Sequence, residues 1–363
     1  MNKKLFQNIL LLFTSSIFCL IILELGIRII SPPPPFDPNF PLVPFQKEKM
    51  KLNIKGISNV GNYSTNKWGL RGEEPPLDWD NNFTILCVGG STTRCRHLDD
   101  KKTWPHLLQE KMRTHYNNNI WIGNAGFSGH TTNGHLIFVE KVVEKIKPDY
   151  VIILAGFNDL GKSISQVASL SNNPRESTGL KYYLYSNLRL VQIFYLWVKI
   201  IKDKPAYDLF ESVEYKPNKI DFKPDSISAN LNLSLPTLIE FEKNIKKIII
   251  KLNNDGIKPL FLTHPMLWED NEYWSDKDGT QGWVTKPRYR LTSAQYANLL
   301  KIFNKKLIEI CTLENIDYFD LAKVIPNSFK NYYDNVHYTE QGSELVATAI
   351  FEYLRTKNMS YTK

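Results

Sequence analysis

A serine follows two glycines at the end of an apolar run in this chain of 363 residues. The run, residues 83–88, shows no alternation of polar and apolar side chains, which is typical of a strand buried on both faces of a parallel sheet. Gly89 and Gly90 permit a sharp turn that lifts the Ser91 hydroxyl clear of the sheet edge. The stretch resembles a nucleophile elbow, the sharp turn between a strand and a helix that exposes a reactive serine. Thr93, however, replaces the second glycine of the G-x-S-x-G pattern. An ordinary turn between a strand and a helix is the alternative.

A nucleophilic serine needs a base, an acid that orients the base, and donors for the oxyanion. Among seven histidines, only His337 has a carboxylate just upstream in a loop that leads into a helix. A short turn can return Asp334 to the Nδ1 side of His337, which leaves Nε2 to face a serine. A polar loop before a helix is the alternative for this stretch alone. His130 and His135 are five residues apart, a poor spacing for metal ligands on a helix, so we expect no metal site there. Ester cleavage by a serine needs no metal and no cofactor, and we expect none.

The elements that must position these residues alternate between strand and helix. Strands are predicted at residues 83–88, 120–122, 150–154, 258–263 and 317–319. Helices are predicted at residues 103–116, 132–147, 238–252, 293–313 and 339–355. This alternation predicts an α/β fold of the flavodoxin-like kind, with a five-stranded parallel sheet between two helical layers.

In such a sheet, ligands bind at the carboxyl ends of the strands, where the strand order reverses. For the order 2-1-3-4-5, this point lies between the first and third strands. Ser91 ends the first strand, Gly126 the second and Asn158 the third. The three residues are therefore expected on one rim of the sheet.

The N-terminal segment differs from the rest of the chain. Lys3 and Lys4 precede an uncharged apolar stretch, residues 5–23, which is about the ~20 residues that a membrane-spanning helix needs. No small-x-small cleavage site is evident, so we favour an uncleaved anchor over a cleaved signal. The lysines predict a cytoplasmic N-terminus and an extracytoplasmic remainder. Residues 1–31 are thus assigned to the anchor, and residues 32–80 to a proline-rich spacer and a packed lead-in around residues 66–72.

Composition excludes several classes of protein. The net charge is +8, but Lys and Arg are scattered rather than clustered, so no nucleic-acid partner is expected. Four cysteines give neither a metal-binding spacing nor a disulfide framework, although a pairing of Cys95 with Cys311 is left open. Two insertions interrupt the α/β pattern at about residues 160–235 and 265–291. The first contains an aromatic helical stretch, residues 182–201, for which core packing is favoured over a lid or a membrane-facing helix. The second contains three tryptophans, Trp268, Trp274 and Trp283.

Four short blocks resemble those of the SGNH (GDSL-like) hydrolases. They are Gly89–Gly90–Ser91, Asn124–Ala125–Gly126, Gly156–Phe157–Asn158–Asp159 and Asp334–Asn335–Val336–His337. They occur in the order of that family, and the resemblance covers about residues 83–355. Gly90 departs from the pattern, since the family usually has Asp there. The anchor and the lead-in look like those of bacterial cell-envelope members.

The resemblance implies a role for each of five residues. Ser91 would be the nucleophile, His337 the base and Asp334 the partner of the base. The backbone N–H groups of Ser91 and Gly126 and the side-chain amide of Asn158 would form the oxyanion hole.

These observations predict a membrane-anchored, extracytoplasmic serine esterase whose hydrolase domain occupies residues 81–358. The expected substrates are O-acyl esters, above all O-acetyl esters, on envelope or exopolysaccharide sugars. Three alternatives remain open: an O-acyltransferase that uses the same triad, a lysophospholipase, and a non-catalytic glycan-binding or scaffold protein.

Overall fold

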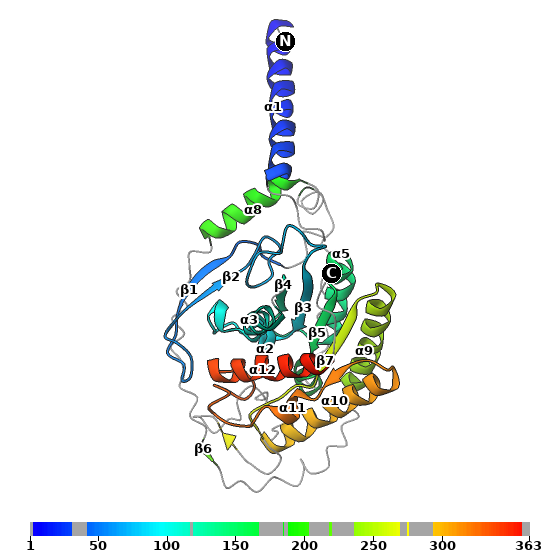
Figure 1. Ribbon diagram of the computed structural model, residues 1–363. Coiled ribbons are helices and arrows are strands. Elements are labelled where there is room, and N and C mark those ends of the chain that lie inside the picture. The colour runs from blue at the N-terminus through cyan, green and yellow to red at the C-terminus, as the bar shows by residue number, and fades with distance from the viewer. Residues whose placement is uncertain are drawn as a thin grey trace.

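A five-stranded parallel sheet forms the centre of the protein in the computed structural model (Figure 1). The structure describes residues 3–30, 42–116, 119–166, 184, 188–202, 218–219, 236–268, 274–275 and 293–357. The strands are β3 (Phe83–Gly89), β4 (Ile120–Gly126), β5 (Tyr150–Leu154), β7 (Lys258–Leu262) and β9 (Tyr318–Phe319). Their order is β4-β3-β5-β7-β9, which confirms the predicted order 2-1-3-4-5. Every residue of β3 and of β5 is buried, as continuous apolar runs require.

Helices form a layer on each face of this sheet. One layer pairs α3 (Trp104–Tyr116) with α12 (Glu340–Thr356). The other contains α4 (Thr132–Phe138), α9 (Pro236–Asn254) and α10 (Ser293–Leu313). The two groups lie on opposite faces because right-handed crossovers to the left and to the right of β3 place their helices on opposite sides. The predicted three-layer α/β architecture is therefore confirmed.

Shorter helical segments complete the core. The predicted helix over residues 132–147 is a run of three pieces: α4, a π-helical turn at Val139–Val143 and α5 (Glu144–Ile146). Two short helices follow strand ends, α2 (Ser91–Arg94) after β3 and α6 (Phe157–Gln166) after β5. A 3-10 turn at Asp100–Lys102 precedes α3, and α11 (Leu321–Val324) follows β9.

The segment before the first core strand packs on the domain. Strands β1 (Lys47–Lys51) and β2 (Val60–Ser64) form an antiparallel hairpin. Leu42, Leu52 and Leu70 are buried in the same hydrophobic core as the central sheet. Residues 42–72 therefore contribute to the core that supports the sheet.

Helix α1 (Lys3–Ile30) projects away from the rest of the molecule (Figure 1). None of its residues is buried, and its most apolar window has a mean hydropathy of 2.4. Among the described residues it is the one helix long and apolar enough to cross a membrane, a property that signal sequences share.

The first insertion contributes helix α8 (Arg189–Lys202), which lies beside the base of α1 (Figure 1). The expectation of core packing for this helix is wrong, because Phe194 is 63% exposed and Trp197 is 57% exposed. A two-residue strand from each insertion, β6 (Asn218–Lys219) and β8 (Trp274–Ser275), pairs antiparallel. Most of the remaining insertion sequence, including Trp283, lies outside the described residues.

The cysteines are all free thiols in the structure. Cys95 and Cys311 are both buried, Cys95 beside α2 and Cys311 within α10. The pairing that the sequence left open does not form.

Candidate active site

The turn after β3 places Ser91 at the first position of α2. A Cβ at Gly89 would lie 2.1 Å from Thr93 Oγ1 and 3.2 Å from the Leu154 carbonyl oxygen, so no side chain fits there. A Cβ at Gly90 would lie 2.5 Å from Asn158 Nδ2. The close approach of Asn158 gives a structural reason for glycine at position 90 in this chain.

Three side chains form a continuous hydrogen-bonded row at this turn. The distance from His337 Nε2 to Ser91 Oγ is 2.7 Å, and the distance from His337 Nδ1 to Asp334 Oδ2 is also 2.7 Å. A carboxylate can only accept, so Nδ1 carries the proton and Nε2 of a neutral ring is free to accept from the Ser91 hydroxyl. The structure thus brings together the three residues that the sequence selected.

Local hydrogen bonds hold Asp334 in this orientation. Its Oδ1 accepts from the backbone N–H groups of Val336 at 2.9 Å and His337 at 2.7 Å. Burial acts to raise the pKa of Asp334, but the His337 charge and these hydrogen bonds outweigh it and hold the pKa below its ordinary value. Asp334 therefore remains an anion that can orient the imidazole and stabilise its protonated form.

A tyrosine and a second histidine support the ring of His337. Tyr333 stacks nearly parallel to it, with ring centroids 5.7 Å apart, and the Tyr333 hydroxyl is 2.8 Å from His97 Nδ1. Burial, with the nearby His337 charge, lowers the pKa of His97 to about 4. His97 is therefore neutral at physiological pH and adds no charge beside the proposed base. Sequence reasoning missed both residues, although Tyr333 directly precedes Asp334.

Arg71 fixes the C-terminal end of the helix that Ser91 begins. Its buried guanidinium donates to the carbonyl oxygens of Arg94, Cys95 and Leu98. It also pairs with Asp100 Oδ1 at 2.8 Å. The last carbonyls of a helix have no partner within it, and a cation there is favourable. Arg71 thus positions α2 from the lead-in segment, a role that its sequence context did not reveal.

Asn158 lies in the first turn of α6, at the end of β5. One amide hydrogen of Nδ2 is donated to the His130 carbonyl oxygen at 2.9 Å. An amide group has two hydrogens, so this bond orients the side chain and leaves the second for another acceptor. The amide lies beside the Gly90 position, next to Ser91.

Gly126 is already engaged at the end of β4. Its N–H donates to Asn124 Oδ1 at 3.0 Å, and a Cβ at this position would lie 2.1 Å from the Arg94 nitrogen. Gly129 in the following loop has a φ of 79°, and nothing lies within 4 Å of where its Cβ would be. Within the described part of the chain, the Gly129 N–H has no hydrogen-bond partner. Sequence reasoning passed over Gly129 because a positive φ is not visible in a glycine-rich loop before the backbone is traced.

Comparison with known protein families agrees with the resemblance carried by the four sequence blocks around Ser91, Gly126, Asn158 and His337. The model of the GDSL-like lipase/acylhydrolase family matches residues 87–345. The chain belongs to this family. The GDSL-like acylhydrolases are ester hydrolases, and the present chain is therefore an enzyme of that class. A search of curated protein sequences finds no match.

Solved structures similar to this acylhydrolase are distant in sequence. One is a putative lipolytic protein of the G-D-S-L family from Desulfitobacterium hafniense DCB-2 (16% identity, TM-score 0.40, covering 75% of this chain and 99% of the other). Another is the acetylxylan esterase Axe2 from Geobacillus stearothermophilus (14%, 0.42, 77% and 96%). A third is the esterase EstA from Pseudoalteromonas sp. (13%, 0.43, 76% and 98%).

His264 contacts α2 through Thr92 but has a different environment from His337. Its Nε2 is 3.0 Å from Thr92 Oγ1, and its Nδ1 is 2.9 Å from the Pro265 carbonyl oxygen. The carbonyl accepts from Nδ1, so Nε2 accepts the Thr92 hydroxyl hydrogen in the neutral ring. Both nitrogens are therefore occupied within the protein, and His264 has no free position for a substrate proton.

This environment predicts a loss of stability in acid. Burial lowers the pKa of His264 to about 4, opposed by the Pro265 carbonyl. In the unfolded chain a histidine titrates near ~6.5, so the unfolded state binds more protons between these values and stability falls as the pH drops through them. For His264 alone we expect about 2 kcal/mol less stability at pH 5 than at pH 8. Urea unfolding of the wild type and of His264→Gln at both pH values measures this difference. Equal acid losses in the two proteins would contradict the prediction.

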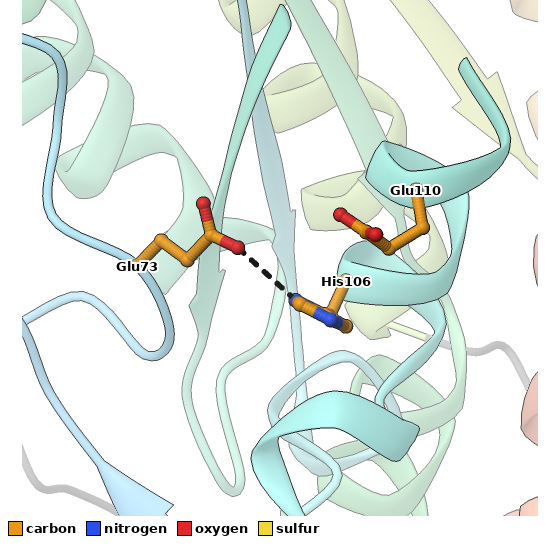
Figure 2. A group of neighbouring side chains, drawn as sticks. All are labelled: Glu73, His106 and Glu110. Atoms are coloured by element: carbon orange, nitrogen blue, oxygen red, sulfur yellow. Dashed lines mark ion pairs between the residues drawn. The ribbon is translucent and has the colours of Figure 1, made fainter. Parts of the chain in front are cut away.

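One group of side chains among the described residues could hold a metal ion, and it lies outside the Ser91 site. Figure 2 shows Glu73 from the lead-in facing His106 and Glu110 on α3. The ligand atoms lie within 4.8 Å of one another, but both glutamates are exposed. Arg113 pairs with Glu73 at 3.0 Å and with Glu110 at 3.4 Å. Both carboxylates are already paired with the Arg113 guanidinium, so we assign the group no role in the chemistry.

Proposed function

We propose that this acylhydrolase is an extracytoplasmic serine esterase, held at the membrane by α1, that cleaves O-acetyl esters on envelope or exopolysaccharide sugars. Ser91 attacks the ester carbonyl, His337 takes the serine proton and returns it to the leaving alcohol, and Asp334 orients His337. The acyl group passes to Ser91 and then to water. The observation that carries the proposal is the row Ser91–His337–Asp334, with 2.7 Å at each step.

The oxyanion hole is proposed on the same rim. The Ser91 N–H lies at the start of α2, where helical N–H groups have no partner within the helix. The second hydrogen of the Asn158 amide supplies another donor. Gly126 can serve only if its N–H leaves Asn124, whereas the Gly129 N–H is unengaged within the described residues, so we add Gly129 as a candidate donor.

The place of α2 favours a substrate away from the bilayer. In Figure 1, α2 lies far from α1 and α8, on the opposite side of the sheet region. The helix that Ser91 begins therefore lies away from the membrane that α1 would span. This arrangement supports a glycan substrate over a lysophospholipid in the same membrane.

The full chain in detergent, assayed on p-nitrophenyl acetate, butyrate and octanoate and on an acetylated oligosaccharide, tests the proposal. We expect the acetate to be cleaved faster than the octanoate, and the oligosaccharide to release acetate. A free oligosaccharide added as acceptor separates hydrolysis from acyl transfer, because transfer would yield a newly acetylated sugar. Preference for octanoate, or inertness towards every ester, would count against the proposal.

Asn158→Ala is expected to lower kcat by ~10²–10³ with little change in KM, because the amide donates to charge that exists only in the transition state. Asn158→Asp should be worse, since a carboxylate has no donor and repels the oxyanion. The measurement is kcat and KM on p-nitrophenyl acetate for both variants.

The bond to His130 gives Asn158 a structural role as well, so the melting temperature of both variants is measured alongside. Losing that bond costs about 1 kcal/mol of stability. A lowered Tm together with a kcat within about threefold of the wild type would restrict Asn158 to holding the loop.

A further inference from the structure

Among the side chains of α8 that the structure describes, two polar ones are buried and two aromatic ones are exposed. Arg189 and Gln192 are buried, and Arg189 Nη1 donates to Gln192 Oε1 at 3.0 Å. Phe194 is 63% exposed and Trp197 is 57% exposed, with ring centroids 6.2 Å apart. A helix on a water-exposed surface has the opposite arrangement. The outer face of α8 therefore suits an apolar or interfacial environment.

A glutamate of α1 fixes the start of α8. The Glu24 carboxylate accepts from the backbone N–H of Arg189 at 2.7 Å and of Leu190 at 2.8 Å. The first N–H groups of a helix have no partner within it, and an anion there is favoured by the helix dipole. Glu24 also pairs with Arg28 one turn later in α1. The N-terminus of α8 is thus tied to the last turns of α1.

The position of Glu24 along α1 determines the depth, relative to the bilayer, at which α8 begins. Glu24 directly follows the uncharged stretch of residues 5–23, which has about the length that crosses the hydrocarbon core. When α1 spans a bilayer, Glu24 lies at the boundary between hydrocarbon and headgroups. The first N–H group of α8 is bonded to Glu24, and α8 runs sideways from the base of α1 (Figure 1). The start of α8 therefore lies at the same boundary.

We propose that α8 is an interfacial helix that lies against the outer surface of the phospholipid bilayer, with Phe194 and Trp197 in the headgroup region. Amphipathic helices bind membranes in this way, and aromatic side chains concentrate at this depth. The proposal rests on the anchoring role proposed for α1. It would fix the orientation of the whole enzyme on the membrane, since a single spanning helix alone leaves the domain free to tilt.

Spin labels in the full-length enzyme, reconstituted into phospholipid nanodiscs, test the proposal. The parent is Cys19→Ser, because the other cysteines are buried and burial raises the pKa of Cys95 and of Cys311 to about 12, which suppresses labelling. Phe194→Cys and Trp197→Cys carry the label on α8. Leu12→Cys reports on α1, and Leu313→Cys, at an 81% exposed position at the end of α10, reports on water. Collision with oxygen is compared with collision with a water-soluble nickel chelate.

At positions 194 and 197 we expect oxygen collisions to dominate, as at position 12 and opposite to position 313. If position 12 reports lipid but positions 194 and 197 behave like position 313, α1 is an anchor and the interfacial role of α8 is wrong. If position 12 also reports water, the anchoring of α1 is wrong as well. Labels at 194 and 197 shielded from both reagents would place this face against protein, such as a second copy of the chain, and would overturn the proposal.

Discussion

Replacing Ser91 by alanine will remove roughly 10⁴–10⁶ of the rate of ester hydrolysis, because the members of a triad act as one unit. The variant keeps the backbone donors but has no atom to form the acyl-enzyme. His337 Nε2 then faces a methyl group instead of the hydroxyl that now lies 2.7 Å away. The measurement is kcat/KM on p-nitrophenyl acetate, with the release of nitrophenol followed over hours to reach the low residual rate.

Ser128→Ala is the matched control for this variant. Ser128 is an exposed serine in the loop that follows β4, on the same rim of the sheet. We expect its removal to leave kcat/KM within about threefold of the wild type, since it belongs to no triad. A Ser91→Ala protein that kept more than a tenth of the wild-type rate, with an unchanged Tm, would exclude Ser91 as the nucleophile.

Asp334→Asn is expected to cost about 10⁴ in kcat, through the wrong tautomer of the histidine. The carboxylate now accepts the Nδ1 hydrogen of His337, which keeps Nε2 free of a proton. An asparagine amide at this position donates to Nδ1, so the proton moves to Nε2 and the ring can no longer accept from Ser91. The backbone N–H groups of Val336 and His337 keep an oxygen acceptor, and the loop should therefore stay folded.

The comparison of His337→Gln with His264→Gln completes this test. Each removes one imidazole near α2, but only His337 has Nε2 within 2.7 Å of the serine hydroxyl. We expect His337→Gln to be about as damaging as Asp334→Asn, and His264→Gln to cost far less. Equal losses for the two histidine variants would show that the base is wrongly assigned.

Local sequence patterns were sufficient to predict the sheet. Strand positions and strand order followed from continuous apolar runs such as Tyr150–Leu154 and from their alternation with helices, because a strand buried on both faces leaves a direct trace in sequence. The row Ser91–His337–Asp334 could also be predicted from the sequence. Asp334 and His337 are close in sequence, and the topology requires the carboxyl ends of neighbouring strands to meet. The catalytic roles of these residues remain predictions until the variants are measured.

Contacts between segments distant in sequence could not be predicted. Arg71 lies in a stretch without periodicity, and its bonds to the end of α2 depend on how the hairpin packs. The bond between Tyr333 and His97 joins residues that are 236 positions apart in the chain. The exposure of Trp197 was mispredicted for a related reason, since an apolar helical pattern does not distinguish a protein core from a lipid surface.

The contacts of the Arg71 guanidinium restrict where a truncated form of this enzyme can start. The family match begins at residue 87, so a fragment started near residue 81 would contain every residue of the proposed triad. It would also lose the guanidinium that donates to the carbonyl oxygens of Arg94, Cys95 and Leu98, in the segment that follows Ser91. A shortened version suited to crystallisation or kinetics should therefore begin before Leu42, whose side chain is part of the core, and remove only α1 and the prolines that follow it.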